Sequence, residues 1–179
     1  MGVSHTTVRQ WLSLLEASYV VFLLYPYHGN LAKRLIKSPK LYFYDVGLAA
    51  YLLGIENPKQ VATHPLRGNL FENCVVIEAL KHRYNGGRTN NLHFYRDGAG
   101  HEVDLIYLMA QHPVPIEIKA GQTVVPDFFK GLRHFESVMK SLPHGGVLVY
   151  GADREFSRGG TRVIGLRGLS RTLGELDKA

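Results

Sequence analysis

EVDLIYLMAQHPVPIEIK, residues 102–119, is the stretch of sequence that decides the fold. Two runs rich in apolar and β-branched residues flank a short polar break. This pattern predicts antiparallel strands at Glu102–Leu108 and Val114–Lys119, joined by a turn centred between Ala110 and Gln111.

The same hairpin places charged residues opposite one another. With that turn, Asp104 faces Glu117 and Glu102 faces Lys119, at a Cβ separation of about 4.5–5.5 Å for directly opposed residues. Alternation along each strand keeps all four side chains on one face. Two carboxylates about 4 Å apart repel by roughly 4 kcal/mol at an effective dielectric constant of about 20, so the arrangement needs a compensating cation.

The predicted cation is Mg²⁺ or Mn²⁺, because these ions prefer hard oxygen ligands and share them with substrate phosphate. Asp104 and Glu117 are its predicted ligands. Lys119 is placed to orient or deprotonate a water and to attract a phosphate. Glu72, an acid among apolar positions of a predicted helix, supplies a further ligand if that helix packs across the sheet. The alternatives are cross-strand ion pairs on a solvent-facing sheet, worth about 0–1 kcal/mol each, and for Glu72 a simple interaction with the helix dipole.

Further elements surround the hairpin in the order α-β-β-β-α-β, which predicts an α/β fold with a mixed sheet and helices on its faces. They are a helix at Asn69–Tyr84, a strand at Leu92–Arg96, a helix at Asp127–Lys140, and strands at Gly146–Tyr150 and around Arg162–Leu166.

The first 60 residues predict a different unit. A helix capped by Thr7, with Gln10 completing a capping box, is followed by strands at Tyr19–Tyr25 and Leu41–Tyr44, which is the order found in the latter half of a winged helix. A short helix at Asp45–Gly54 and a linker at Glu56–Pro65 follow. We therefore expect a partial winged-helix segment at 1–60, a second domain at 61–179, and a chain that is a fragment or begins within a domain.

The net charge of +6 favours a polyanionic partner. A solvated basic face is the alternative reading. The predicted nucleic-acid contacts are Arg9, Lys33, Arg34, Lys37, Lys40 and Arg96.

Other classes of protein are not supported by the sequence. Its apolar runs, such as 20–24, are much shorter than the roughly 20 residues of a membrane span, so we expect a cytoplasmic protein without a membrane partner. The single cysteine excludes an internal disulfide. The sequence has no glycine-rich phosphate loop and no dinucleotide fingerprint, so no ATP site is expected within it.

The acidic hairpin and its surroundings resemble the PD-(D/E)XK nuclease superfamily, through Glu102-Val103-Asp104 followed by Pro115-Ile116-Glu117-Ile118-Lys119 and preceded by an acidic helix. More narrowly, the chain is similar to the C-terminal region of predicted prokaryotic AAA-type ATPases. The matching stretches are KLYFYDVGL at 40–48, GNLFEN at 68–73 and YRD at 95–97.

The resemblance implies a restriction-endonuclease-like core in which Glu72, Asp104, Glu117 and Lys119 hold the active-site positions. It leaves two functions open: a Mg²⁺-dependent endonuclease or exonuclease acting on DNA or RNA, or a catalytically silent domain that binds nucleic acid or protein for an ATPase. Because the sequence contains none of the ATPase core, we expect a truncated or freestanding form whose ATPase partner is a separate domain or subunit.

Overall fold

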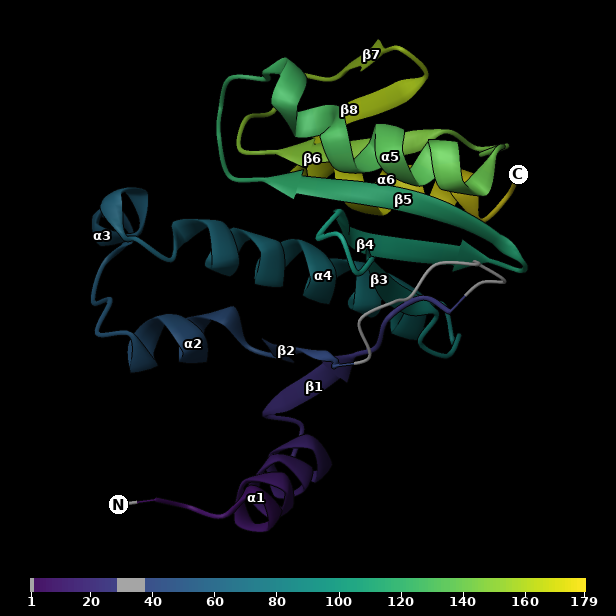
Figure 1. The fold of residues 1–179 in the computed structure, drawn as a ribbon. Coiled ribbons are helices and arrows are strands. Elements are labelled where there is room, and N and C mark those ends of the chain that lie inside the picture. The colour runs from purple at the N-terminus through teal and green to yellow at the C-terminus, as the bar shows by residue number, and fades with distance from the viewer. Residues whose placement is uncertain (1, 29–37) are drawn as a thin grey trace.

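A mixed sheet forms the centre of the protein, as seen in a computed structural model that describes residues 2–28 and 38–179. Among these residues, six strands pair in the order β3-β4-β5-β6-β8-β7 (Figure 1). The pairs β5–β6 and β6–β8 are parallel and the others antiparallel. The strands are β3 (Leu92–Arg96), β4 (Glu102–Met109), β5 (His112–Lys119), β6 (Gly146–Tyr150), β7 (Phe156–Arg158) and β8 (Thr161–Gly165).

Helices cover both faces of this sheet. Helices α4 (Arg67–Asn85) and α6 (Leu169–Leu176) contact each other on one face, and α5 (Lys130–Met139) lies on the other, as Figure 1 shows. Short 3-10 turns, η1 (Pro126–Phe129) and η2 (Leu166–Gly168), lead into α5 and α6. The predicted mixed α/β fold and the order α4-β3-β4-β5-α5-β6 are confirmed.

The N-terminal hairpin joins the same hydrophobic core through Phe22, Leu24 and Tyr42. Helix α1 (His5–Ala17) leads to a hairpin of β1 (Val21–Leu24) and β2 (Lys40–Phe43), followed by α2 (Val46–Leu52) and α3 (Pro58–Thr63). The buried side chain of Asn73 on α4 fixes this hairpin, because it accepts from the N–H of Phe43 at 2.9 Å and donates to its carbonyl at 2.7 Å. The division of the chain near residue 60 stays a prediction.

Several local predictions were wrong. Ser4, rather than Thr7, caps α1, and its side chain accepts from the N–H of Thr7. The segment predicted as a linker contains α3, whose capping box joins Asn57 and Gln60. Strand β7 and helix α6 were not predicted. No helix in the described parts of the chain is long and apolar enough to cross a membrane.

The central hairpin has the predicted register, from Leu105 opposite Ile116 to Met109 opposite His112. The β4–β5 pairing ends at Leu105 and Ile116, so Asp104 and Glu117 lie one residue beyond it. On its other edge, β4 has a register shift against β3, where Tyr95 pairs with Val103. Such an irregularity bends a strand and re-aims its side chains. Asp104 therefore lies where β4 leaves the regular ladder.

Candidate metal centre

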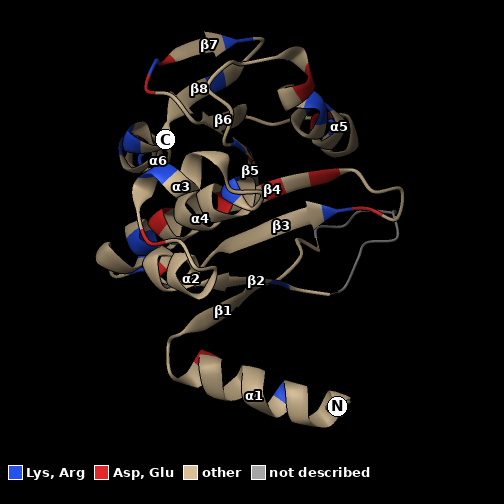
Figure 2. Ribbon diagram, turned by 90° about the vertical axis from the view of Figure 1, so that its left-hand side faces the viewer, with Lys and Arg blue, Asp and Glu red and all other residues tan. Residues whose placement is uncertain are grey.

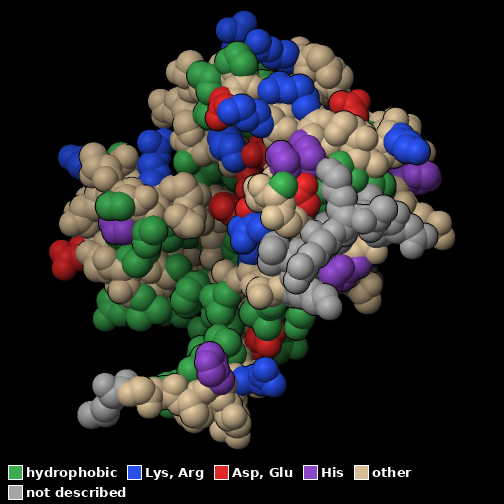
Figure 3. Space-filling model, in the orientation of Figure 1, with side chains coloured by type: hydrophobic (Ala, Val, Ile, Leu, Met, Phe, Trp, Pro, Cys, Tyr) green, Lys and Arg blue, Asp and Glu red, His purple; other side chains and the backbone are tan. Residues whose placement is uncertain are grey.

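The predicted site residues line one hollow of about 720 Å³, a size typical of ligand pockets. Figure 2 shows the acidic positions of β4 beside the basic end of β3, and Figure 3 shows acidic and basic side chains close together near the middle of one face. The structure brings together all four residues predicted from the hairpin and helix, with three further charged residues. The charged lining consists of Lys40, Glu72, Arg96, Glu102, Asp104, Glu117 and Lys119.

Where the β4–β5 pairing ends, the side chain of Asp104 accepts a hydrogen bond from the backbone of β5. Its Oδ2 accepts from the backbone N–H of Ile118 at 2.8 Å and contacts Nζ of Lys119 at 3.2 Å. Burial raises the pKa of Asp104, with a further contribution from Glu72, against the opposing effect of Lys119. The backbone thus holds this carboxylate in one orientation.

Glu117 is the least satisfied acid of the site. It is only 6% exposed, and its Oε1 contacts Nζ of Lys119 at 2.5 Å. Its Oε2 is buried and has no hydrogen-bond partner among the described residues. Burial, reinforced by the charge of Asp104, raises the pKa of Glu117 to about 8. A buried acceptor without a donor costs about 1–3 kcal/mol, and more when it is charged.

The chemistry of the donor set suits a hard divalent cation. Oxygens of Glu72, Asp104 and Glu117 do not all lie within 4.8 Å of one another, so these side chains must move closer to share one ion. Asp104, Glu117 and Glu72 offer carboxylate oxygens, the ligand type that Mg²⁺ and Mn²⁺ prefer, and the unpartnered Oε2 is an available ligand atom. Lys119 balances part of the negative charge. The neighbouring carboxylates raise the pKa of Lys119 despite its burial, so its ammonium form is favoured.

Glu72 on α4 is held by residues of β2. Its Oε1 accepts from Nζ of Lys40 at 2.9 Å and from the hydroxyl of Tyr42 at 2.5 Å. Nζ of Lys40 also contacts Oε1 of Glu102 at 2.5 Å. Burial acts to lower the pKa of Lys40, but the charges of Glu72, Asp104 and Glu102 and the hydrogen bond with Glu102 together raise it. Helix α4 packs against β5 and brings Glu72 into the pocket.

The basic residues predicted to contact nucleic acid lie in different places. Lys40 lies in the acidic site, where it pairs with Glu72 and Glu102, and its predicted contact with nucleic acid stays a prediction. Arg96 is at the pocket but pairs with Glu102 at 2.6 Å. Arg9 is exposed on α1 and does not line the pocket. The other predicted contacts, Lys33, Arg34 and Lys37, lie outside the described residues.

Glycine at position 131 lets α5 approach the site. A Cβ atom there would collide with the carbonyl oxygen of Glu102 and would lie 2.7 Å from Oε2 of Glu117. Helix α5 therefore covers Glu117 so closely that a side chain has no room, which explains why that carboxylate is buried.

The sequence prediction missed Lys40 and Tyr42 as parts of the site. Lys40 and Tyr42 contact Glu72 although they lie 32 and 30 positions before it in the chain. Neither strand periodicity nor local spacing carries a signal for such a contact.

Two family models match the chain. One is described as "Domain of unknown function (DUF4143)" and matches residues 67–169, which include the sheet from β3 to β8 and all four acidic residues of the pocket. The other is described as "Domain of unknown function (DUF8612)" and matches residues 1–59. The boundary between the two matches falls within the segment that contains α3.

Two mycobacterial proteins are similar to this chain. They are "Uncharacterized protein Rv2008c" of Mycobacterium tuberculosis and "Uncharacterized protein Mb2031c" of Mycobacterium bovis, each 32% identical over 135 residues. The match covers 74% of this chain and 29% of each relative, so the chain spans less than a third of the length of these proteins. No solved structure matches the chain.

Proposed function

We propose, from the premise that this chain belongs to the family described as Domain of unknown function (DUF4143), that it is a metal-dependent nuclease-like domain that hydrolyses phosphodiester bonds of DNA. The observation that carries the proposal is the buried, unpartnered Oε2 of Glu117 beside Asp104 and Lys119. The resemblance of the core α4-β3-β4-β5-α5-β6 to the PD-(D/E)XK superfamily supports it.

Mg²⁺ or Mn²⁺ is the proposed cofactor, with Asp104, Glu117 and Glu72 as the residues that would hold it. When bound, such an ion supplies Lewis-acid stabilisation of phosphoryl oxygens and lowers the pKa of a water. The contribution of the protein is to fix these carboxylates. The N–H of Ile118 orients Asp104, and the hydroxyl of Tyr42 orients Glu72.

Lys119 has a proposed role toward the substrate. Its raised pKa keeps a proton on the ammonium group, which favours attraction of the scissile phosphate and orientation of a water over removal of a proton. Its side chain is 33% exposed, so a phosphate can reach it. Arg96, 40% exposed at the same pocket, is the proposed second contact to the DNA backbone.

A catalytically silent binding domain is the second candidate. The ion pairs of Lys40 with Glu72 and Glu102 favour it, because they satisfy two acids without a metal. In that case affinity for DNA falls steeply with salt and survives loss of Asp104. Flat salt dependence would indicate a protein partner, for which an AAA-type ATPase domain or subunit is the proposed class.

Nicking of supercoiled plasmid by the purified chain tests the proposal. We expect cleavage with Mn²⁺ or Mg²⁺ and none with EDTA. Asp104→Asn and Lys119→Met should each reduce the rate by about 10²–10³-fold, the usual effect of removing a group that stabilises the transition state.

The exposed pair Asp127 and Lys130 provides matched controls. Asp127→Asn and Lys130→Met change the same residue types on the surface and should leave cleavage unchanged. Cleavage that survives both site variants would reject this site, and binding without cleavage in every metal would favour the silent domain.

A further inference from the structure

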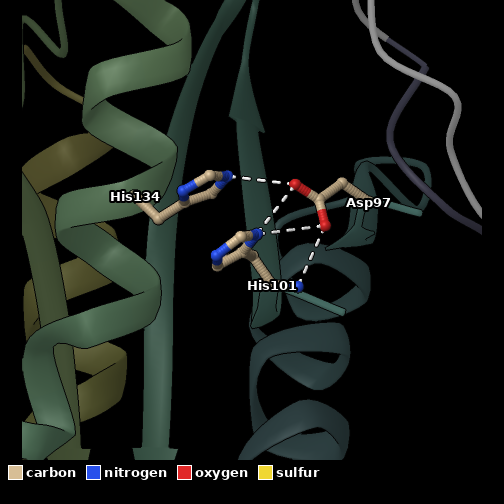
Figure 4. A group of neighbouring side chains, drawn as sticks. All are labelled: Asp97, His101 and His134. Atoms are coloured by element: carbon tan, nitrogen blue, oxygen red, sulfur yellow. Dashed lines mark hydrogen bonds and ion pairs between the residues drawn. The ribbon is translucent and has the colours of Figure 1, made fainter. Parts of the chain in front are cut away.

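A second cluster of possible metal ligands lies next to the candidate centre and shares no residue with it. Asp97 follows β3, His101 precedes β4, and His134 projects from α5 (Figure 4). One ligand atom from each lies within 4.8 Å of the other two. The turn between β3 and β4 and a helix 37 positions away thus meet at one carboxylate.

Both imidazoles contact the same carboxylate oxygen. Nδ1 of His101 lies 3.0 Å from Oδ2 of Asp97, and Nε2 of His134 lies 3.1 Å from it. Two ligand atoms at about 2.1 Å from a tetrahedral Zn²⁺ are about 3.4 Å apart. The two N···O separations are close to this value, and all three atoms lie within 4.8 Å of one another. Because imidazole binds a metal in the plane of its ring, at least one ring must rotate out of the parallel stack before both can bind one ion.

Backbone hydrogen bonds hold the carboxylate of Asp97 in one orientation. Its Oδ1 accepts from the backbone N–H groups of Ala99 at 3.0 Å and His101 at 2.9 Å. Burial acts to raise the pKa of Asp97, but hydrogen bonds from His101 and Ala99 outweigh it and lower the pKa to about 2. Hydrogen bonds of this kind hold a ligand side chain in the orientation that binds a metal.

The two imidazole rings are parallel, with centroids 3.7 Å apart and an interplanar angle of 9°. Neutral imidazole is the form that binds metals. His101 is 50% exposed, so solvent reaches the cluster and can fill a remaining coordination position.

We propose that Asp97, His101 and His134 form a second cation site that binds Zn²⁺ or a similar borderline transition metal. Two imidazoles and one carboxylate are a typical ligand set for such ions and differ from the all-oxygen set of the candidate Mg²⁺ centre. The bound ion connects the β3–β4 turn to α5. Arg96, at the end of β3, and Glu102, at the start of β4, flank this turn and line the pocket. Zn²⁺ at this site therefore stabilises one wall of the candidate centre.

Calorimetric titration with ZnCl₂ of the full chain, freed of metal, tests the site. The titration uses Glu117→Gln as the parent protein, so that the candidate Mg²⁺ centre does not compete. We expect one Zn²⁺ per chain, with an affinity that excess Mg²⁺ leaves unchanged. His101→Ala and His134→Ala should each weaken it by at least about 10–100-fold. His144→Ala, in a histidine pair with His112 that has no place in the cluster, is the control and should have the affinity of the parent.

Co²⁺ provides a second readout through its visible d–d absorption, which should be lost in His134→Ala. Thermal unfolding in EDTA checks that each variant is folded, and the half-exposed His101 is the position least expected to affect folding. Equal Zn²⁺ affinity in the parent and in a His101→Ala/His134→Ala double variant, or no Zn²⁺ binding by the parent, would overturn the proposal. The three residues would then form only a hydrogen-bonded clamp. Neither result decides the proposed nuclease activity, which is tested separately by plasmid cleavage in Asp104→Asn and Lys119→Met.

Discussion

Glu117 combines two properties that rarely occur together in a stable protein, deep burial and an unpartnered carboxylate oxygen. A structural acid would gain a donor or lie in solvent. Lys119 contacts only Oε1 of Glu117. A side chain at position 131 cannot approach Oε2, because even a Cβ atom there would lie 2.7 Å from it. The simplest physical reason for such a residue is a ligand that binds there.

The pH dependence of stability should report this carboxylate. The pKa of Glu117 is about 8 in the folded protein against 4.5 as its ordinary value. Between these values the folded state holds a proton that the unfolded state has lost, so this group makes the free energy of unfolding fall as pH rises. We therefore expect the difference in the free energy of unfolding between the metal-free wild type and Glu117→Gln to change with pH between these two values.

Urea denaturation in EDTA at several pH values measures this difference. Groups common to both proteins cancel, and the wild type should lose on the order of 1–3 kcal/mol relative to Glu117→Gln on going from pH 5 to pH 8. Added Mg²⁺ should remove much of this loss. Parallel curves for the two proteins would show that Glu117 ionises normally.

The ammonium group of Lys40 lies between Glu72 and Glu102 and pairs with both. Lys40→Met leaves these acids facing each other, so the metal-free protein should lose about 1–3 kcal/mol, between the effects of exposed and buried ion pairs. Mg²⁺ should stabilise the variant more than it stabilises the wild type. Thermal unfolding with and without Mg²⁺ measures both effects, and Lys59→Met on the exposed face of α3 should change neither.

At the scale of elements, the site depends on how closely α5 approaches β4 and β5. Gly131→Ala should lower the free energy of unfolding by about 1–3 kcal/mol, because the added methyl group collides with Glu102 and Glu117. Gly68→Ala in α4 is the matched control. Nothing lies within 4 Å of its added Cβ, so stability should be unchanged or rise by up to about 1 kcal/mol.

Urea denaturation of the two glycine variants decides the point. If Gly131→Ala were as stable as the wild type, α5 would have to stand further from the sheet than the structure shows. The burial of Glu117 would then lose its explanation.

The hairpin and the main helices were predictable from sequence because local rules determine them. The turn after Ala110 fixes the register of β4 and β5. The apolar residues of α4 are not confined to one face, so the position of Glu72 beside the sheet was not fixed by the sequence. The irregularity at Asp104 was not predictable, since it depends on β3 as well as β5. Lys40 and His134 join their clusters only through contacts distant in sequence, which no local pattern encodes.

At the scale of the molecule, stability is unevenly distributed. Helix α1 has no buried residue, and Figure 1 shows it projecting from the rest of the chain. Trp11 and Leu14 on this helix are 55% and 65% exposed. Low burial predicts low local stability.

Hydrogen exchange followed by mass spectrometry measures this distribution. We expect amides of α1 to exchange well before those of β4 and β5, which lie at the centre of the sheet. Protection of α1 equal to that of β5 would contradict this account, and would show that another surface covers the apolar side chains of α1 in solution.

The net charge of the whole chain gives less guidance about a DNA surface than its value suggests. Several arginines near the C-terminus pair with acids: Arg162 with Glu175 at 2.9 Å, Arg171 with Glu155, and Arg167 with Asp153 at 3.8 Å. The acidic pocket, rather than the overall charge, therefore defines the proposed function.

Anomalous diffraction from a crystal soaked in Mn²⁺ tests the central claim most directly. The account predicts a peak in the pocket about 2.0–2.2 Å from carboxylate oxygens of Asp104 and Glu117, including Oε2 of Glu117. A fully soaked crystal without a peak there, in which Lys119 still pairs with both acids, would contradict it.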